Sequence, residues 1–217
     1  MTSAPRIVSV NVGTPRTVSW GGRRVTSAIW KTPVAGRTGV AGINLAGDDQ
    51  ADRRVHGGHD KAVYAYAIED YRWWSGELGT EVGPGAFGEN LTTEGIDLRA
   101  EVVGRRWHVG SAVLEVAQPR EPCYKLGMRM GDAAFVDRFG EGGRFGAYLR
   151  VIDAGDIGAG DEIVIGVPPA HGLTLTELAG VQRDAPRALL DRVASIDDVP
   201  RGVREWARRQ LGRRDRS

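Results

Sequence analysis

The stretch Val102-Val-Gly-Arg-Arg-Trp-His-Val-Gly-Ser-Ala-Val-Leu-Glu-Val-Ala117 decides the fold class of this chain. Its two halves, residues 102–109 and 112–117, are rich in valine and flank Gly110-Ser111, which predicts a β-hairpin. Further strand patterns occupy residues 6–12, 17–20, 23–29, 61–66, 148–152 and 162–167. Short strands separated by glycines are typical of a barrel or a sandwich, and barrel closure would also hide the sheet edges. We therefore predict a mostly β protein, with a β-barrel over residues 1–168.

The pattern becomes helical after the prolines at 168 and 169. Three helix starts are visible: Thr174 with Glu177 as a capping box, Asp184 as an N-cap before Pro186 in the first turn, and Pro200 as the residue that opens a third helix. We predict a subdomain of three short helices over residues 170–217. Their apolar faces are too small for an independent core, so the helices should pack on the barrel or on a partner subunit. A homodimer is left open.

Composition excludes several classes of protein. The chain has 217 residues, 41% of them apolar and 26% charged, as expected of a globular protein. A net charge of +1 gives no global attraction to nucleic acid or to a membrane surface. We read the arginines at 201–216 as the solvated face of a terminal helix. No apolar run is long enough for a membrane span, and one cysteine cannot form an internal disulfide. The sequence thus predicts a cytoplasmic protein that binds neither nucleic acid nor a membrane.

The only cysteine, Cys123, lies in the segment Gln118-Pro-Arg-Glu-Pro-Cys-Tyr-Lys125, directly after a predicted strand. The two prolines stiffen this loop, and the nearby cations Arg120 and Lys125 favour the thiolate. A thiolate is a nucleophile and a soft metal ligand. The alternative is a small buried hydrophobic residue. From the residues alone, both interpretations of Cys123 stay open.

Two other segments carry polar groups next to glycines. In His56-Gly-Gly-His-Asp-Lys61, the pair Gly57 and Gly58 would let the backbone approach a ligand closely. His56 and His59 lack a clear third partner for a metal site. In Gly85-Ala-Phe-Gly-Glu-Asn-Leu91, Asn90 could bind a ligand or satisfy main-chain groups of a buried turn. The alternative for the first segment is a polar loop, and the alternative for the second is a buried turn.

Together the motifs resemble the MOSC family, the domain also found at the C-terminus of molybdenum cofactor sulfurases, and within it the YiiM-like branch. The matching segments are Ser27-Ala-Ile-Trp-Lys-Thr-Pro33, Gly47-Asp-Asp-Gln-Ala-Asp52, His56-Gly-Gly-His-Asp-Lys-Ala-Val63, Gly85-Ala-Phe-Gly-Glu-Asn-Leu91 and Gln118-Pro-Arg-Glu-Pro-Cys-Tyr-Lys-Leu126. The resemblance covers nearly the whole chain and implies a β-barrel with a three-helix appendage. His59 departs from the branch, which usually has proline there, and residues 143–148 also differ from its usual form.

The resemblance implies a pterin-dithiolene molybdenum cofactor (molybdopterin), with the Cys123 thiolate as a molybdenum ligand. The implied cofactor contacts are Lys31, His56, Gly57, Gly58, Lys61, Asn90, Arg120 and Lys125. Related proteins reduce N-hydroxylated compounds, and the YiiM-like branch is associated with detoxifying hydroxylaminopurine bases. The sequence shows no flavin, haem or iron–sulfur motif, so electrons should come from a separate donor protein.

Two other functions stay open at this point. In the first, Cys123 carries a persulfide for sulfur transfer, although no pyridoxal-phosphate sulfurase domain that could charge it is visible in this sequence. In the second, the protein is a non-catalytic carrier of the cofactor. All three functions predict a reactive Cys123, and only the reductase predicts bound molybdenum together with turnover.

Overall fold

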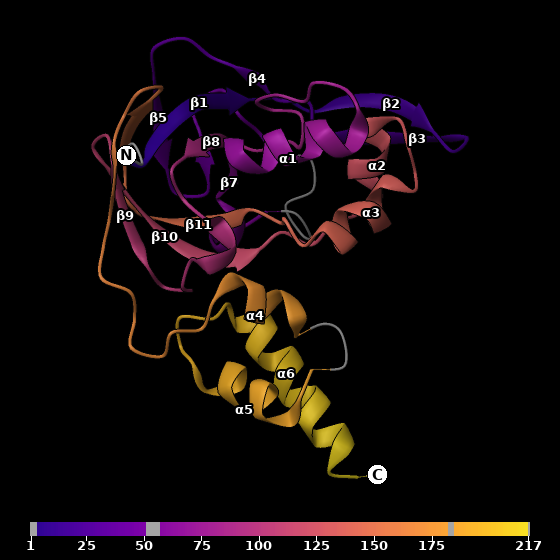
Figure 1. The fold of residues 1–217 in the computed structure, drawn as a ribbon, viewed down its shortest axis with the longest axis vertical. Coiled ribbons are helices and arrows are strands. Elements are labelled where there is room, and N and C mark those ends of the chain that lie inside the picture. Colours follow the sequence, from indigo (N-terminus) through magenta and orange to yellow (C-terminus); the bar gives the residue numbers. More distant parts are fainter. Residues whose placement is uncertain (1–3, 51–56, 182–184, 217) are drawn as a thin grey trace.

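A curved sheet of eight strands forms the centre of the protein (Figure 1). The computed structural model describes residues 4–50, 57–181 and 185–216. The strand order in the sheet is β13-β9-β10-β11-β7-β8-β1-β4. The strands are β1 (Arg6–Val12), β4 (Thr32–Pro33), β7 (Val63–Ala67), β8 (Leu91–Glu94), β9 (Arg106–Val109), β10 (Ala112–Pro119), β11 (Ala147–Asp153) and β13 (Ile163–Ile165). Neighbours pair antiparallel except β7 and β8, which are parallel.

Two smaller sheets accompany the large one. One joins β12 (Gly155–Gly158), β5 (Arg37–Ala41) and β6 (Asn44–Leu45), and the other is the hairpin of β2 (Arg16–Trp20) and β3 (Arg23–Ser27). The predicted hairpin around Gly110 is confirmed as β9 and β10. Gly110 has a φ of +57°, and a Cβ there would lie 2.1 Å from the carbonyl oxygen of Asp156. Glycine is therefore required by both the turn and the close approach.

The predicted closed barrel is not found among the described residues. Strands near the two opposite edges of the sheet meet at one isolated bridge, between Arg6 of β1 and Glu162 just before β13. There the Ile7 N–H donates to Asp161 O and the Ile163 N–H donates to Pro5 O, each over 2.8 Å. Farther along β1, Asn11 and Val12 pair with β4 instead. Because β4 takes up that part of the edge, the ladder does not continue around the sheet.

Three α-helices cover the end of the sheet where the chain crosses between strands: α1 (Ile68–Leu78), α2 (Tyr124–Met130) and α3 (Phe135–Gly142). The spacing of Tyr71, Trp74 and Leu78 at i, i+3 and i+7 predicts a helix over residues 69–78, which corresponds to α1, whereas the sequence predicted neither α2 nor α3. An aromatic cluster packs beneath them, comprising Tyr64, Tyr66, Tyr71, Trp74, Phe87, Phe135 and Phe139 with Leu126 of α2. The Tyr71 and Phe87 rings stack at 4.9 Å, and the Trp74 indole donates a 2.9 Å hydrogen bond to the Tyr66 hydroxyl. This cluster anchors α2 and the loop before it. The one-turn helices η1 (His59–Lys61) and η2 (Leu98–Ala100) lie in connections.

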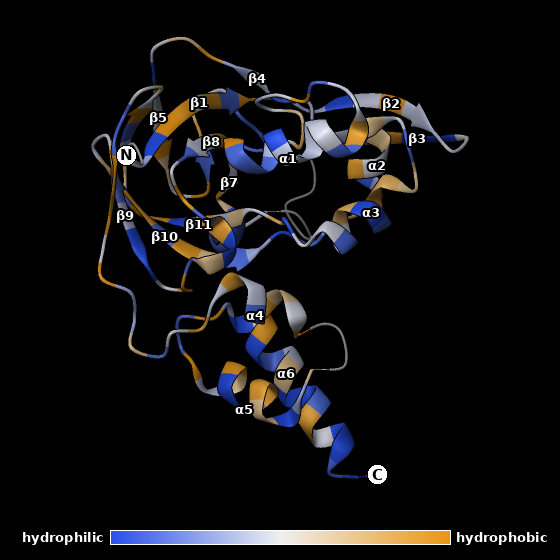
Figure 2. Cartoon of the chain, in the orientation of Figure 1, coloured by the Kyte–Doolittle hydropathy of each residue, from blue (hydrophilic) through white to orange (hydrophobic). Residues whose placement is uncertain are grey.

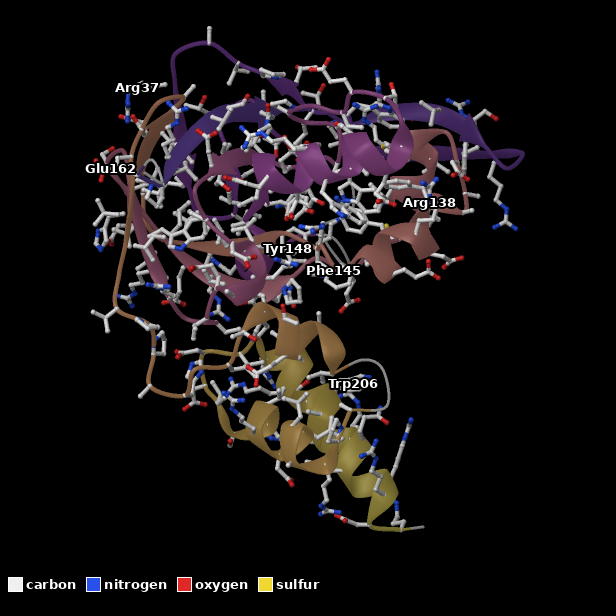
Figure 3. All side chains as sticks on the ribbon, in the orientation of Figure 1. Arg37, Arg138, Phe145, Tyr148, Glu162 and Trp206 are labelled. Carbon is white, nitrogen blue, oxygen red and sulfur yellow. The ribbon has the colours of Figure 1, made fainter. Side chains whose placement is uncertain are left out.

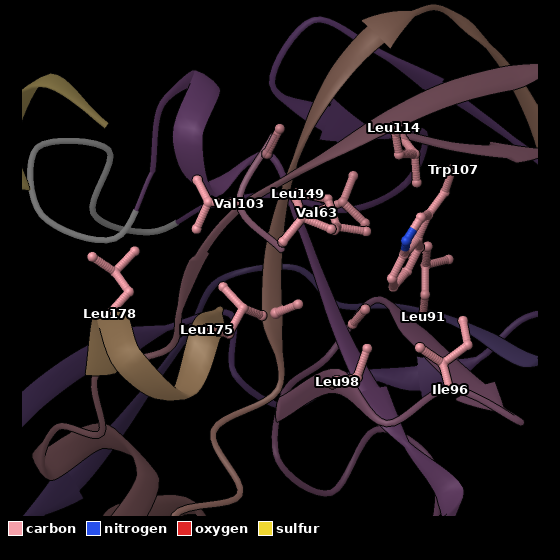
Figure 4. Packing of buried hydrophobic residues seen from close by; sticks show 14 of the residues in the cluster. Val63, Leu91, Ile96, Leu98, Val103, Trp107, Leu114, Leu149, Leu175 and Leu178 are labelled. Atoms are coloured by element: carbon pink, nitrogen blue, oxygen red, sulfur yellow. The ribbon is translucent and has the colours of Figure 1, made fainter. Parts of the chain in front are cut away.

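The residues after 170 are helical, as predicted, with α4 (Leu175–Gly180), α5 (Arg187–Ser195) and α6 (Arg201–Arg214) in the described part. Figure 2 shows hydrophobic and hydrophilic residues on different sides of α5 and α6, as in amphipathic helices. Leu175 and Leu178 of α4 are buried in the same cluster as the sheet residues and lie next to Val103 (Figure 4). The helices thus pack on the sheet. The division into domains at residues 168–170 stays a prediction.

The predicted helix starts have mixed outcomes. The capping box is confirmed, because the Glu177 N–H donates to the Thr174 hydroxyl over 3.2 Å and the Thr174 N–H donates to the Glu177 carboxylate over 2.8 Å. Pro200 directly precedes α6, as predicted. Asp184 lies outside the described residues. Among the helices of the described ranges, none is both long and apolar enough to cross a membrane.

Thr174→Ala is expected to lower the free energy of unfolding by about 1 kcal/mol, because it removes the acceptor for an otherwise orphaned helix N–H. Urea unfolding monitored by circular dichroism measures the change. Thr32→Ala, at an exposed residue of β4, is the control and should change stability by less than about 0.5 kcal/mol. An equal loss in the two variants would contradict a role for the capping box.

Candidate functional site

One pocket brings together six of the predicted site residues: Lys31, Lys61, Asn90, Arg120, Cys123 and Lys125. It encloses about 680 Å³ of empty space, part of it open to solvent. The remaining wall comes from the segments 27–29 and 48–50, Gly88, Glu121 and the rings of Tyr64 and Tyr148. Tyr148 lies near the centre of the molecule (Figure 3).

The other predicted site residues lie elsewhere. Gly57 and Gly58 line a neighbouring groove against Trp206 of α6, and Lys61 and Glu121 line both the groove and the pocket. Gly58 has a φ of +95°, which favours glycine. His56 lies outside the described residues. Within the described part of the chain, no three His, Cys, Asp or Glu residues are grouped to hold a metal ion by themselves.

Cys123 is the last residue before α2, with extended φ and ψ of −138° and 170°. Its carbonyl oxygen accepts a 2.8 Å hydrogen bond from the Leu126 N–H in the first turn of the helix. Leu126 is fully buried in the aromatic cluster, so α2 fixes where the loop ends. The Cys123 side chain is partly exposed at the pocket wall.

Lys31 and Asp48 form a buried ion pair on the pocket wall, with side chains 9% and 2% exposed. The Asp48 carboxylate also accepts hydrogen bonds from the Gly13 N–H, over 2.8 Å, and from the Asn90 side-chain amide, over 2.9 Å. Burial lowers the pKa of Lys31, while the Asp48 charge and hydrogen bond oppose that shift. Asp48 therefore connects two predicted cofactor contacts, Lys31 and Asn90. Sequence reasoning did not single out Asp48, although it lies in the quoted motif at 47–52.

Arg120 places a buried guanidinium at the pocket, donating to the Phe87 carbonyl and facing the Tyr64 ring at 5.0 Å. Burial alone would lower the pKa of Arg120, but the Tyr64 and Tyr148 hydroxyls and the Cys123 thiol raise it, and the net direction is upward. Burial raises the pKa of the Tyr64 and Tyr148 phenols. The pocket thus has a permanent positive charge against neutral aromatic groups.

Glu89 organises the loop that carries Asn90. Its fully buried carboxylate accepts hydrogen bonds from the Gly85 N–H (2.5 Å), the Tyr71 hydroxyl (2.7 Å) and the Thr92 hydroxyl (2.8 Å). Burial raises the pKa of Glu89, and these hydrogen bonds oppose the rise. Sequence reasoning missed Glu89 as a structural centre of this motif.

Asn90 satisfies main-chain groups and also lines the pocket, while its binding of a ligand stays a prediction. Its side-chain oxygen accepts a 3.1 Å hydrogen bond from the Tyr64 N–H, as the buried-turn interpretation requires. Its amide nitrogen reaches Asp48 at the pocket. Gly88, two residues before Asn90, has a φ of +78°, and a Cβ there would lie 2.7 Å from the Ile29 side chain. The loop therefore needs glycine to close against the opposite pocket wall.

The charges along the pocket favour an anion. The lining cations are Lys31, Lys61, Arg120 and Lys125, and the lining carboxylates are Asp48, Asp49 and Glu121. Four positive and three negative groups leave a formal charge of +1. With one thiol in the wall, the arrangement can bind an anionic group and present a soft ligand or nucleophile beside it.

Comparison with known proteins gives consistent matches. A sequence profile of the MOSC domain matches residues 52–164. The chain is 36% identical over 154 residues to the uncharacterized protein YflK of Bacillus subtilis, covering 71% of this chain and 70% of YflK. It is 34% identical to a "Reductase" of Gibberella moniliformis, over 72% of this chain and 28% of that protein. The crystal structure of YiiM from Geobacillus stearothermophilus superposes with a TM-score of 0.79 at 30% identity, covering 95% of this chain and 99% of YiiM.

Proposed function

Since this chain belongs to the MOSC domain family, we propose that it is a molybdenum-cofactor-dependent oxidoreductase that reduces N-hydroxylated compounds, such as hydroxylaminopurine bases, with the Cys123 thiolate as a molybdenum ligand. The observation that carries the proposal is the pocket that unites Cys123 with four cationic side chains. MOSC domains are generally associated with the molybdenum cofactor. A relative that bears the name reductase supports the direction of the reaction.

The residues present fit such a cofactor. Its phosphate needs cations and hydrogen-bond donors, which Lys31, Lys61, Arg120 and Lys125 supply. The amide of Asn90 donates to Asp48 and to the Asn11 carbonyl, and so holds the pocket wall in place. Charge-assisted hydrogen bonds of this kind contribute roughly 1.5–3 kcal/mol each. The described residues do not offer a three-ligand cluster, and Cys123 is the one soft ligand. That donor set suits a metal that arrives with its own dithiolene sulfurs and needs one protein thiolate.

The reaction to be performed is R–NHOH + 2 e⁻ + 2 H⁺ → R–NH₂ + H₂O, in which the N–O bond breaks and the oxygen leaves as water. When bound, the cofactor would supply the two-electron redox chemistry. Cys123 would hold the metal, and the cations would hold the cofactor phosphate. The Tyr64 and Tyr148 rings, 5.1 Å apart, form an aromatic wall suited to exclude water and contact a flat substrate.

The test uses protein expressed with molybdate in a host that makes the cofactor. Molybdenum is measured by elemental mass spectrometry, and hydroxylaminopurine reduction is followed with reduced viologen. Near-stoichiometric molybdenum with turnover supports the proposal. Bound cofactor that transfers to other apoenzymes, without turnover, would identify a carrier. Cyanolysable sulfur on Cys123 without any metal requirement would identify sulfur transfer.

Lys125→Ala is expected to weaken cofactor retention about ten- to a hundredfold, because one charge-assisted hydrogen bond of roughly 1.5–3 kcal/mol is lost. Molybdopterin retained after gel filtration, measured by fluorescence after oxidation, reports the change. Lys125→Arg keeps the charge and serves as the matched control. Unchanged molybdenum content in Lys125→Ala would count against a binding role for this lysine.

A further inference from the structure

A groove lies beside the Cys123 pocket, between the segment 57–61 and the start of α6. It holds about 1100 Å³ of empty space, part of it open to solvent. Lys61 and Glu121 line both the groove and the pocket, and Glu121 stands two residues before Cys123 in the chain. The two spaces therefore adjoin, so that one molecule can occupy both.

The two walls of the groove are held by one guanidinium. Arg150 of β11 donates to the Asp60 carboxylate in η1 over 2.6 Å and to the Asp198 carbonyl oxygen, just before α6, over 3.0 Å. Arg150 also donates to the Glu115 carboxylate of β10 over 2.9 Å, and its side chain is only 18% exposed. Because the same side chain fixes both walls, the groove is formed before any ligand binds, as is usual for small-molecule sites.

Three residues of α6 line the groove at helical spacing: Gly202, Trp206 and Arg209. Trp206 is partly buried and packs against the core cluster of the sheet, so its ring is held in place. Figure 3 labels Trp206 in the helical part of the molecule. A Cβ at Gly202 would meet no described atom within 4 Å beyond the helix's own backbone. The helix thus presents a fixed aromatic ring next to an empty position.

The composition of the groove favours a flat ring without a net charge. Two cations and two carboxylates line it beside His59, namely Lys61, Arg209, Asp60 and Glu121. These four charges cancel, whereas those of the pocket leave +1. A tryptophan ring stacks on the faces of flat heterocycles such as nucleobases. The Gln118 amide, which also lines the groove, can donate and accept hydrogen bonds, as the edge of a purine does.

The pterin of the cofactor is a competing occupant, because Gly57 and Gly58 were predicted as cofactor contacts and line the same groove. The cations Lys31, Arg120 and Lys125, however, line the pocket and not the groove. A cofactor held by these cations stays in the pocket. The groove is then left for the molecule that reacts there.

We propose that this groove is the subsite for the ring of a heteroaromatic N-hydroxylated substrate, which lies flat on Trp206 while its N–OH group reaches the Cys123 pocket. This inference rests on the proposed function and names the part of the protein that selects the substrate. The ring is unchanged by the reaction, so the groove contributes to binding and not to the redox step. N-hydroxylated compounds without a ring enter the pocket and make no contact with Trp206.

The test uses two groove variants. Gly202→Leu fills the groove from a helical position that leucine also adopts, and Trp206→Ala removes the stacking ring. Trp206→Phe keeps an aromatic face. Gly212→Leu, at a second glycine of α6 that does not line the groove, is the matched control, because a Cβ there meets only the Arg216 side chain at 3.8 Å.

Calorimetry measures hydroxylaminopurine binding to the cofactor-loaded protein without an electron donor. Viologen-driven assays compare the KM for hydroxylaminopurine with the KM for N-methylhydroxylamine, which has no ring. We expect Gly202→Leu and Trp206→Ala to weaken hydroxylaminopurine binding about tenfold or more, as loss of a base–aromatic stack does. The ratio of the two KM values should rise by the same factor. Trp206→Phe and Gly212→Leu should change binding by less than about threefold, and molybdopterin content should match the wild type throughout.

Unchanged hydroxylaminopurine binding in Gly202→Leu would overturn the proposal, even where Trp206→Ala loses binding through a weakened core. Wild-type protein that does not bind hydroxylaminopurine would also overturn it. A loss of molybdopterin in Gly202→Leu would assign the groove to the pterin instead. An equal rise of both KM values would identify a general entrance and not a ring subsite. If the wild type turns over neither compound but hydroxylaminopurine binding is lost only in the groove variants, the subsite stands and the proposed reaction is wrong.

Discussion

Cys123→Ser is expected to abolish molybdenum retention and to lower viologen-driven turnover by at least about a hundredfold, since a metal contact contributes several kcal/mol and each 1.4 kcal/mol is a factor of ten. A serine hydroxyl stays protonated near neutral pH and is a hard oxygen donor, so it replaces a thiolate poorly on a sulfur-rich metal. Elemental mass spectrometry and turnover on the same preparation measure the two effects.

The fold should survive this substitution. Cys123 is the N-cap residue of α2, and serine is among the best residues at that position. The melting temperature of Cys123→Ser should therefore match that of the cofactor-free wild type. Tyr124→Phe is the control, because it removes only a hydroxyl from the adjacent residue, whose side chain is 53% exposed. Full metal content and activity in Cys123→Ser would rule out the thiolate as a ligand.

Local patterns predicted the strands and helices whose stability depends on neighbours in the sequence. The alternation in residues 6–12 corresponds to β1, and the valine-rich stretch around Gly110 forms β9 and β10. The sequence missed α2 and α3. Each is short and contains a glycine, and both are held by aromatic packing, such as the Trp74 and Phe139 rings stacked at 5.6 Å. Packing between residues so far apart has no periodic signal in the sequence.

The predicted barrel failed for a related reason. Strand patterns specify which residues alternate between faces, and not which edge pairs with which. The start of β1 pairs with Glu162, just before β13, whereas the end of β1 pairs with β4. Pro33 of β4, the partner of Asn11, lies outside the segments in which the sequence showed a strand pattern. Edge pairing is set by long-range geometry.

The site was predictable where a motif lay in one segment and not where two segments meet. Cys123, Arg120 and Lys125 stand in one short segment, and the sequence placed them together. Asp48 gains its importance from Asn90, 42 residues away, and Glu89 from Tyr71, 18 residues away. Buried polar partners of this kind are visible only after folding, because their role is to satisfy one another.

Asp48→Asn is expected to lower the free energy of unfolding by about 3–5 kcal/mol, because it leaves the Lys31 ammonium buried without its counter-charge. Lys31→Met in the same background removes the unpaired charge, so the double variant should regain most of that loss. Urea unfolding of the wild type, Asp48→Asn, Lys31→Met and the double variant completes this double-mutant cycle. Additive losses, with no recovery in the double variant, would show that the two residues are not coupled.

The pH dependence of Asp48→Asn gives a second measurement with a defined sign. Burial already lowers the pKa of Lys31 below its ordinary value of 10.5, and without Asp48 nothing of comparable size opposes the shift. Glu89 still raises this pKa, and Arg120 lowers it. The unfolded chain then binds a proton that the folded protein lacks, so the stability of Asp48→Asn rises with pH between the lowered pKa and 10.5. The rise should be absent in the double variant, where no lysine is buried. A stability of Asp48→Asn that falls with pH over that window would contradict a buried, proton-releasing Lys31.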